Sequence, residues 1–273
     1  MKDIQTDLGT GTDEPIEACS SAGRLTARMI RPSNPVPAPP VVILHGISRN
    51  AGDLARLFSP EAERTGRTLV VPYFSEDAWP TFQRPCKAAR PDQALLALLD
   101  AVAATLPGRA GPVDLFGHSG GAQLAHRFAM LYPHRVTALH LVAAGWYCLP
   151  DETMPYPYGL APGTDRAGVT WARRHTDGLR EFLRLPVSVY VGSRDVARDP
   201  ALRTTSALDA GQGRNRHARA RAYVAALTAA ADRIALPARA RFVELPECDH
   251  DVVRAITRND LAARVLDARR TPS

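Results

Sequence analysis

Short continuous runs of apolar residues recur along the chain and alternate with longer segments in which apolar residues repeat at helical spacing. The run VVILH at 41–45 is rich in β-branched residues, which is typical of a strand buried on both faces. Similar runs predict further strands at 68–73, 113–117, 138–144, 187–192 and 240–245. Helices are predicted at 51–65, 91–106, 120–132 and 218–235. This alternation predicts an α/β fold, with a mostly parallel central sheet and helices on both faces.

Two segments break the alternation of strands and helices. Residues 31–40 hold five prolines, which exclude helix and central strand because proline has no backbone N–H to donate. Residues 148–183 begin with a stretch too rich in proline and glycine for regular structure. We predict that 148–183 forms a short lid insertion over a site, the alternative being an ordinary surface excursion. The chain as a whole, 1–273, is predicted to be a single domain.

The composition is that of an ordinary globular protein. Of 273 residues, 45% are hydrophobic and 23% are charged, so the chain can bury a sizeable core. The net charge of +6 is carried mainly by scattered arginines, with no run of five or more basic residues. The densest basic stretch, with Arg214, Arg216, Arg219 and Arg221, has no interleaved aromatic residues on which bases could stack. We therefore expect no nucleic-acid site, and interpret these arginines as a solvated or salt-bridged face.

The sequence lacks signals for a membrane, for secretion and for a bound cofactor. The first ten residues contain no apolar stretch, and no window approaches about 18 continuous apolar residues, so we expect a cytoplasmic protein without membrane contact. Four cysteines lie far apart without C-x-x-C spacing, which predicts free thiols. There is no P-loop, and no G-x-G-x-x-G follows the first strand, so we expect no nucleotide cofactor.

The strongest chemical signal is GHSGG at 117–121, a G-x-S-x-G pattern between a predicted strand and a predicted helix. So tight a turn holds the serine in a strained conformation, and the flanking glycines remove side chains that would clash. Ser119 then lies at a helix N-terminus, where the N–H of Gly120 is placed to stabilise an oxyanion. The alternative is a glycine-rich turn with an incidental serine, but the context favours a nucleophile.

A serine hydroxyl near neutral pH needs a base within hydrogen-bond reach, and His250 is the candidate. It follows the last predicted strand, so it lies at the carboxyl edge of the sheet and can face Ser119. The other histidines lie within predicted elements, in the lid or in the arginine-rich stretch, or have a structural task at the end of the first strand. Asp195, just past the glycine that ends another strand, is the predicted acid that orients His250, and Asp199 is its rival.

The residues around His250 allow a second interpretation, a metal site. Residues 247–251 read Glu-Cys-Asp-His-Asp, and all five side chains could ligate a metal ion. Five adjacent residues cannot all converge on one ion, however, and no second histidine or cysteine cluster supplies the remaining ligands. We therefore expect no metal.

The loop LHGISRN at 44–50 follows a buried strand and has the form of a second oxyanion element. The backbone N–H of Ile47 is predicted to donate to the oxyanion, since Gly46 lets the loop pass close to a substrate carbonyl. Ser48, Arg49 and Asn50 are predicted to line the pocket, the alternative being loop capping and solvation.

From about residue 25 to 268 the chain resembles the α/β-hydrolase superfamily, in which an HG pair, a G-x-S-x-G elbow, an acid and a late histidine follow in this order. Within that superfamily, GHSGGAQLAHRFAMLYPHRV, AAGWYCLPD and LRTTSALDAGQGRNRHARARAY are similar to bacterial hydrolases related to polyhydroxybutyrate depolymerases and carboxylesterases. The resemblance implies an α/β-hydrolase fold, no cofactor and a catalytic triad of Ser119, Asp195 and His250.

The mechanism that the resemblance implies is acylation of Ser119 by an ester, with His250 as base, and then hydrolysis of the acyl-enzyme by water. The chain departs from the family at Cys248 and Asp249, where glycine often stands, which leaves the geometry of that loop open. The aromatic residues implied for an acyl or alcohol pocket, with core packing as the alternative, are Trp146, Tyr147, Tyr156, Tyr158 and Trp171. An acyltransferase or amidase on the same triad, and a non-catalytic ligand-binding protein with a relic triad, remain as alternatives.

Overall fold

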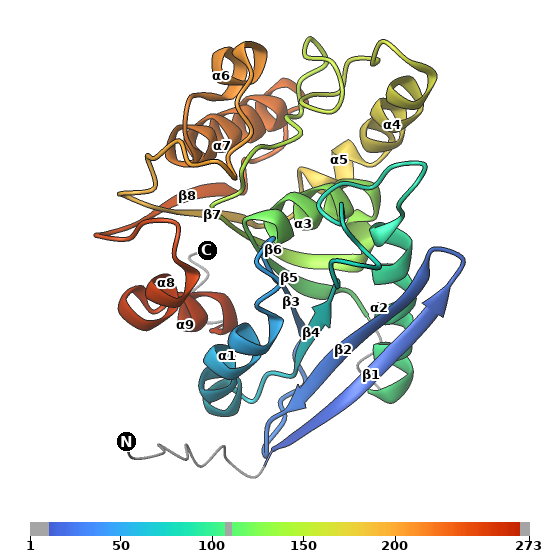
Figure 1. Cartoon of the computed structure of the whole chain (residues 1–273), viewed down its shortest axis with the longest axis vertical. Helices are drawn as coiled ribbons and strands as arrows, with labels where there is room; N and C mark the ends of the chain where they lie inside the picture. The colour runs from blue at the N-terminus through green and yellow to red at the C-terminus, as the bar shows by residue number, and fades with distance from the viewer. Residues whose placement is uncertain (1–10, 107–110, 268–273) are drawn as a thin grey trace.

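The computed structural model describes residues 11–106 and 111–267 of the chain. Within these ranges an eight-stranded sheet has the strand order β1-β2-β4-β3-β5-β6-β7-β8 (Figure 1). The strands are β1 Thr12–Ser20, β2 Gly23–Arg31, β3 Val41–Leu44, β4 Leu69–Tyr73, β5 Val113–His118, β6 Val136–Val142, β7 Val187–Gly192 and β8 Ala240–Leu245. The helices are α1 Ala51–Thr65, α2 Pro91–Thr105, α3 Gly120–Leu131, η1 Pro133–Arg135, α4 Arg166–Asp177, α5 Leu179–Phe182, α6 Ser206–Gln212, α7 Arg216–Arg233, α8 Val252–Asn259 and α9 Leu261–Leu266.

The sheet is parallel over most of its width and antiparallel at one edge. Neighbouring strands pair in parallel from β4 through β3, β5, β6 and β7 to β8, so the predicted mostly parallel sheet is confirmed. The strands β1 and β2 form an antiparallel hairpin that joins the sheet through an antiparallel β2–β4 pairing. No strand was expected before residue 41, and the hairpin is therefore an addition to the predicted fold.

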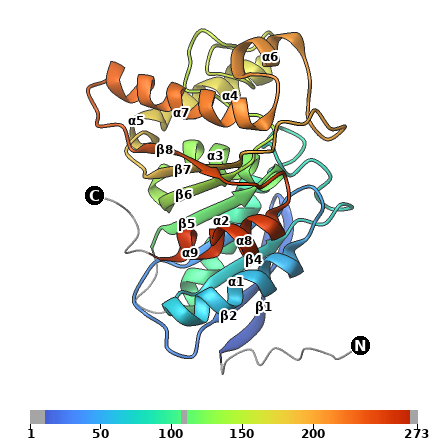
Figure 2. The same cartoon turned by 90° about the vertical axis from the view of Figure 1, so that its left-hand side faces the viewer.

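The parallel strands are buried on both faces, as their apolar runs predict. Along β3, Val42 and Leu44 pack into the core beneath α2 and α3, whereas Val41 and Ile43 pack into the core beneath α1, α8 and α9. Successive side chains of a strand point to opposite faces, so the four residues of β3 contribute side chains to two cores. Figures 1 and 2 show α1, α8 and α9 together on one face of the sheet, with α2 and α3 on the other.

The loops that follow β3, β5, β7 and β8 all leave the sheet at the same edge, because these strands are parallel. These four loops contain Ile47, Ser119, Asp195 and His250. The topology alone therefore gathers the predicted nucleophile, acid, base and oxyanion donor at the carboxyl edge of the sheet.

The segment 148–183 has no helix or strand before α4, apart from an isolated bridge between Pro155 and Ala161. The helix α4 begins where the Asp165 side chain accepts a hydrogen bond from the N–H of Gly168, and it packs against α3. The single-domain assignment and the lid remain predictions.

Two expectations, on a secretory signal and on membrane contact, are compared here with the described residues. The residues 1–10, on which the expectation of no secretory signal rests, lie outside the described part of the chain. Among the described residues, no helix is long and apolar enough to cross a membrane.

Candidate active site

The serine of the GHSGG pattern forms the turn between β5 and α3. Ser119 has φ 52° and ψ −110°, a strained conformation for a residue with a side chain, and its N–H donates to the Val142 carbonyl on β6 at 2.8 Å. A Cβ on Gly121 would lie 2.3 Å from the Leu44 carbonyl oxygen, so only glycine lets α3 start this close to β3. The sequence pattern thus encodes the geometry that holds the Ser119 hydroxyl at the sheet edge.

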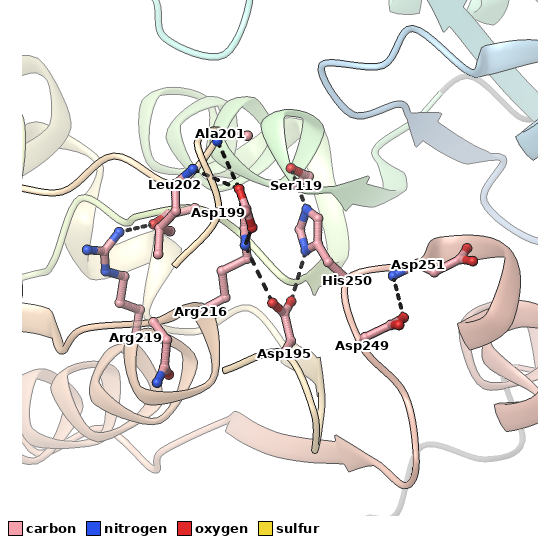
Figure 3. A network of polar contacts seen from close by, with 12 residues as sticks. Ser119, Asp195, Asp199, Ala201, Leu202, Arg216, Arg219, Asp249, His250 and Asp251 are labelled. Atoms are coloured by element: carbon pink, nitrogen blue, oxygen red, sulfur yellow. Dashed lines mark hydrogen bonds and ion pairs between the residues drawn. The ribbon is translucent and has the colours of Figure 1, made fainter. Parts of the chain in front are cut away.

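The three residues predicted as a triad are brought together in hydrogen-bonding order (Figure 3). His250 Nε2 lies 3.2 Å from Ser119 Oγ, and His250 Nδ1 lies 2.8 Å from Asp195 Oδ2. A carboxylate can only accept, so the ring proton belongs on Nδ1, and Nε2 is left to accept the serine hydroxyl proton. Asp195 is buried, whereas the His250 side chain is 31% exposed, so solvent and small molecules reach the imidazole. The arrangement can turn Ser119 into a nucleophile.

The two candidate acids have different partners. Asp199 does not touch His250; both of its oxygens face Arg216, the first residue of α7. The hydrogen bond from Arg216 lowers the pKa of Asp199 to about 2. Arg216 also lies 3.5 Å from Asp195 Oδ1, the oxygen that His250 does not use. Asp195 therefore bridges the imidazole and a buried guanidinium, as Figure 3 shows.

A second histidine supports the loop that carries His250. His118 Nε2 lies 3.3 Å from the His250 carbonyl oxygen and therefore donates to it, and the two rings have centroids 5.0 Å apart. Burial, and next the nearby His250, lower the pKa of His118 to about 3. His118 is therefore neutral at physiological pH and holds the His250 backbone in place without adding charge beside the imidazole.

The five side chains at 247–251, considered above as metal ligands, point to different partners. Glu247 pairs with Arg194, Asp249 pairs with Arg254, and Asp251 caps α8, while Cys248 is buried in the core. No group of three or more potential metal-ligating side chains lies together in residues 11–106 and 111–267.

The loop geometry left open at Cys248 and Asp249 is set by a glycine on the facing loop. A Cβ on Gly192, at the end of β7, would lie 2.1 Å from the Cys248 carbonyl oxygen. That same carbonyl accepts the N–H of Arg194 at 2.8 Å. The close approach that glycine often allows in the His250 loop is thus provided by Gly192, which draws the Asp195 and His250 loops together.

The loop after β3 passes directly over the nucleophile. The backbone nitrogen of Ile47 lies 3.4 Å from the position of a Cβ on Gly120, and a Cβ on Gly46 would lie 3.5 Å from Ser119 Cβ. The loop after β3 thus lies close to both Ser119 and Gly120, and donation by the N–H groups of Ile47 and Gly120 to an oxyanion stays a prediction. First-turn N–H groups of a helix have no partner within the helix, so Gly120 is free to donate to a bound oxyanion.

Ser48 and Arg49, predicted as pocket residues, continue this loop. Ser48 is exposed, and its place in the pocket stays a prediction. The Arg49 guanidinium donates to the carbonyls of Phe74 and Trp79 and lies over the Phe82 ring. Arg49 thus fastens the loop after β3 to the loop after β4, and its role as a substrate-binding residue stays a prediction.

The five aromatic residues predicted for the pocket fall into separate places. Trp146 and Tyr158 contact each other edge to face, with ring centroids 5.0 Å apart. Tyr147 is fully buried and stacks on Tyr223, as a core residue does. Trp171, on α4, belongs to neither of these two pairs of rings.

The Trp171 ring lines a cavity of about 620 Å³ together with Lys87, Arg90, Arg166, Ala167, Thr170 and Arg174. None of the triad residues lines that cavity. Of the predicted aromatic residues, the structure thus brings Trp146 and Tyr158 together, stacks Tyr147 on Tyr223, and places Tyr156 and Trp171 against His175.

Three residues near the triad were missed by sequence reasoning. Arg216 was interpreted as part of a solvated or salt-bridged stretch, and it is buried and salt-bridged to both acids. His118 was set aside because its direction is fixed by the elbow. Gln83, in the loop after β4, has its Cγ 2.9 Å from the position of a Cβ on Gly120, and no motif marks it.

Comparison with known proteins places this geometry among solved structures. No model of a protein family matches the sequence, and no curated protein matches it. The chain is similar to LpqC, a poly(3-hydroxybutyrate) depolymerase from Bordetella parapertussis, with 30% identity, coverage of 97% of this chain and 92% of the other, and a TM-score of 0.76. It is also similar in fold to poly(aspartic acid) hydrolase-1 from Sphingomonas sp. KT-1, with 21% identity, coverage of 93% and 98%, and a TM-score of 0.77. A third similar fold is the esterase Pf2001 from Pyrococcus furiosus, with 14% identity, coverage of 96% and 92%, and a TM-score of 0.60.

Proposed function

Since this chain belongs to the α/β-hydrolase superfamily, we propose that it is a serine hydrolase that cleaves a carboxylic ester through an acyl-enzyme on Ser119. The observation that carries the proposal is the hydrogen-bond chain from Asp195 through His250 to Ser119, with distances of 2.8 and 3.2 Å. Each of these distances lies within reach of proton transfer between a nucleophile, a base and an orienting acid.

In the first half-reaction Ser119 Oγ attacks the ester carbonyl carbon while its proton passes to His250 Nε2. Asp195 stabilises the imidazolium that forms, and the N–H groups of Ile47 and Gly120 donate to the carbonyl oxygen as it becomes negative. The tetrahedral intermediate then collapses. His250 returns the proton to the alkoxide, the alcohol leaves, and the acyl group remains on Ser119.

The second half-reaction repeats these steps with water in place of the serine. His250 removes a proton from water, the hydroxide attacks the acyl carbon, and the carboxylic acid is released as Ser119 recovers its proton. The name of the Bordetella parapertussis relative, a poly(3-hydroxybutyrate) depolymerase, makes esters of short hydroxy acids the first natural substrates to test.

Labelling with a fluorophosphonate probe, followed by p-nitrophenyl butyrate hydrolysis, tests the proposal directly. We expect the wild-type protein to be labelled and to hydrolyse the ester, and Ser119→Ala to lose both. Ser59→Ala is the matched control, because the Ser59 hydroxyl donates within α1 to the Ala55 carbonyl. Labelling that persists in Ser119→Ala, or a wild-type protein that is not labelled, would show that Ser119 is not an activated nucleophile.

Two further assays separate ester hydrolysis from its alternatives on the same triad. Adding a primary alcohol as competing acceptor distinguishes an acyltransferase, because the acyl group would then appear as a new ester rather than as free acid. The matching p-nitroanilide distinguishes an amidase. We expect the free acid as the main product and an ester rate well above the amide rate.

A cytoplasmic location and the absence of a nucleic-acid partner are part of the same proposal. Cell fractionation checks the first. An electrophoretic mobility assay with DNA and RNA at physiological salt checks the second, and we expect no shift.

A further inference from the structure

A buried arginine without a carboxylate partner lies next to the proposed nucleophile. Arg127 is on α3, and its side chain is completely buried. Its Nη1 donates to the Gln123 carbonyl at 2.8 Å, but Nε and Nη2 have no hydrogen-bond partner. In the described part of the chain, no carboxylate forms an ion pair with Arg127.

Among the arginines that the structure describes, the other buried ones form ion pairs with carboxylates, and Arg127 is the exception. The ion pairs are Arg67 with Asp114, Arg216 with Asp195 and Asp199, and Arg219 with Asp209. A buried guanidinium without a counter-charge is strongly unfavourable, because burial removes its hydration, and one carbonyl and one aromatic ring replace that hydration only in part. A core position would accommodate leucine or methionine at no such cost. Arg127 is therefore better explained by an anion that it binds than by packing.

The surroundings of Arg127 favour an anion further. Its Cζ lies 4.2 Å from the centroid of the Trp146 ring, and the exposed Arg203 lies 5.7 Å from the same ring. Besides burial, the groups that act on the pKa of Arg127 are the weak acids Cys148, Tyr156 and Tyr223 and the cation of Arg84.

The hydroxyl of Tyr156 is a second buried donor without a partner. The pKa of Tyr156 rises to about 12, chiefly because of burial, so the hydroxyl keeps its proton and can donate it. A carboxylate group could accept from both Arg127 and Tyr156.

The position of Arg127 links this charge to the scissile bond. Ser119 precedes the first residue of α3, and Arg127 lies two turns further along the same helix. The Arg127 side chain reaches back to the Gln123 carbonyl, so its guanidinium lies about one to two turns from Ser119, or about 5–10 Å. On the facing loop, Gln83 lies against Gly120 and the next residue, Arg84, acts on Arg127. Residues 83–84 therefore lie near both the nucleophile and the guanidinium.

We propose that the ester cleaved at Ser119 carries a free carboxylate, and that Arg127 and the Tyr156 hydroxyl bind that carboxylate a few bonds from the scissile carbonyl. This inference rests on the function proposed above and names its substrate class, a short ester with one anionic end. The bound carboxylate supplies the counter-charge that Arg127 does not receive from the described residues, and it fixes the substrate along α3.

Two pairs of esters, each differing only in charge, test the proposal on the wild-type protein. For a carboxylate on the acyl side, the pair is monoethyl glutarate and its neutral isostere ethyl 5-methylhexanoate. For a carboxylate on the alcohol side, the pair is 4-acetoxybutanoate and 4-methylpentyl acetate. Acid release in a pH-stat gives kcat/KM for each. We expect the charged member of one pair to be preferred about tenfold or more, which corresponds to one charge-assisted hydrogen bond.

Variants then assign the preference to Arg127. Arg127→Met removes the charge at similar volume, and we expect the ratio of charged to neutral kcat/KM to fall to about one. Arg127→Lys keeps a point charge but not the planar fork, so part of the preference should remain. Arg173→Met is the matched control: Arg173 is an exposed residue of α4, and its removal changes the net charge equally but should leave the ratio unchanged.

The outcomes separate this inference from the proposed function. Hydrolysis of the neutral esters with no charge preference in either pair would overturn the carboxylate subsite and leave the serine hydrolase intact. A preference that Arg127→Met and Arg173→Met lower equally would also overturn it, since long-range charge would then be the cause. A wild-type protein inactive on all four esters and unlabelled by fluorophosphonate would overturn the proposed function itself. If Arg127→Met does not fold, the wild-type ratio and that of Arg127→Lys decide the question.

Discussion

Five buried histidines predict that this protein unfolds in mild acid, well above the pH at which carboxylates titrate. Burial lowers the pKa of His45, His140 and His175 to about 4, that of His118 to about 3, and that of His126 well below its usual value. Two of the rings also accept backbone hydrogen bonds: His126 from the Cys148 N–H and His45 from the Phe74 N–H. Protonation would replace each of these acceptors by a donor that faces another donor.

The sign and size of the effect follow from linkage. In the unfolded chain these histidines have an ordinary pKa near 6.5, so the unfolded state binds more protons than the folded state between about pH 6.5 and 4. Stability is therefore fully present above about pH 7 and falls as the pH drops through this window. At pH 5.5 each of these histidines lowers the free energy of unfolding by roughly 1 kcal/mol, and together they lower it by several kcal/mol. This loss is of the same order as the whole stability of a typical domain, about 5–15 kcal/mol.

Reversible urea unfolding at intervals from pH 8 to pH 5 measures this dependence. We expect the free energy of unfolding to be level above pH 7 and to fall steeply below pH 6.5, with a proton uptake on unfolding of about four to five near pH 5.5. His126→Gln keeps a polar amide on α3 but cannot be protonated, so its stability should depend less steeply on pH by about one proton. His134→Gln, at an exposed position, controls for the removal of a histidine as such.

A change of less than about 2 kcal/mol between pH 7.5 and pH 5.5 would refute the reasoning. It would mean that the buried rings are protonated in the folded state or that their burial is relieved in acid. The slope, rather than the absolute stability of each variant, is the quantity to compare, because the substitution itself also changes packing.

Three further predictions concern the site. Ser119→Ala and His250→Ala should each lower turnover by several orders of magnitude, with the double variant little worse than either, and additive losses would argue against a triad acting as a unit. Asp195→Asn should lower turnover severely and Asp199→Asn mildly, as measured by kcat on p-nitrophenyl butyrate, and the reverse ranking would assign the acid to Asp199. Gly121→Ala should destabilise the protein by about 1–3 kcal/mol or more in thermal melts, because its Cβ would lie 2.3 Å from the Leu44 carbonyl oxygen. Gly52→Ala in α1 is its control: a Cβ there meets nothing within 4 Å, so the helix should gain about 0.5–1 kcal/mol.

The parallel part of the sheet could be predicted from the sequence because its strands are buried on both faces. All four residues of β3 are buried, and their side chains alternate between the two cores. Such a strand therefore needs an unbroken apolar run. The hairpin of β1 and β2 could not be predicted in this way. Its edge strand β1 is exposed over its first four residues and at alternate positions after them, and it contains Pro15, so it has no continuous apolar run. An exposed edge strand resembles a polar loop more than it resembles the buried strands.

The nucleophile and base were predictable because each lies where a strand must end, and the sheet topology brings those ends together. The buried arginines were not, because their partners are set by the packing of distant elements. Arg219, for example, donates to the Gly145 carbonyl 74 positions away in sequence. One feature of the sequence does mark Arg127 as unusual. It stands inside the apolar helix AQLAHRFAML, where a charged residue needs an explanation.

The choice between Asp195 and Asp199 shows what only the structure can decide. Both follow Gly192 within a few residues, and the sequence favours Asp195 only by its position nearer the end of the strand. In the structure Arg216 engages both oxygens of Asp199 but only Oδ1 of Asp195, which leaves Oδ2 of Asp195 to accept from His250 Nδ1. The first residue of α7 thereby determines which acid is available to the imidazole. Arg216 acts on the triad through Asp195. Because Asp199 balances the charge of Arg216, the guanidinium can lie beside Asp195 and His250 without being an uncompensated cation in the core.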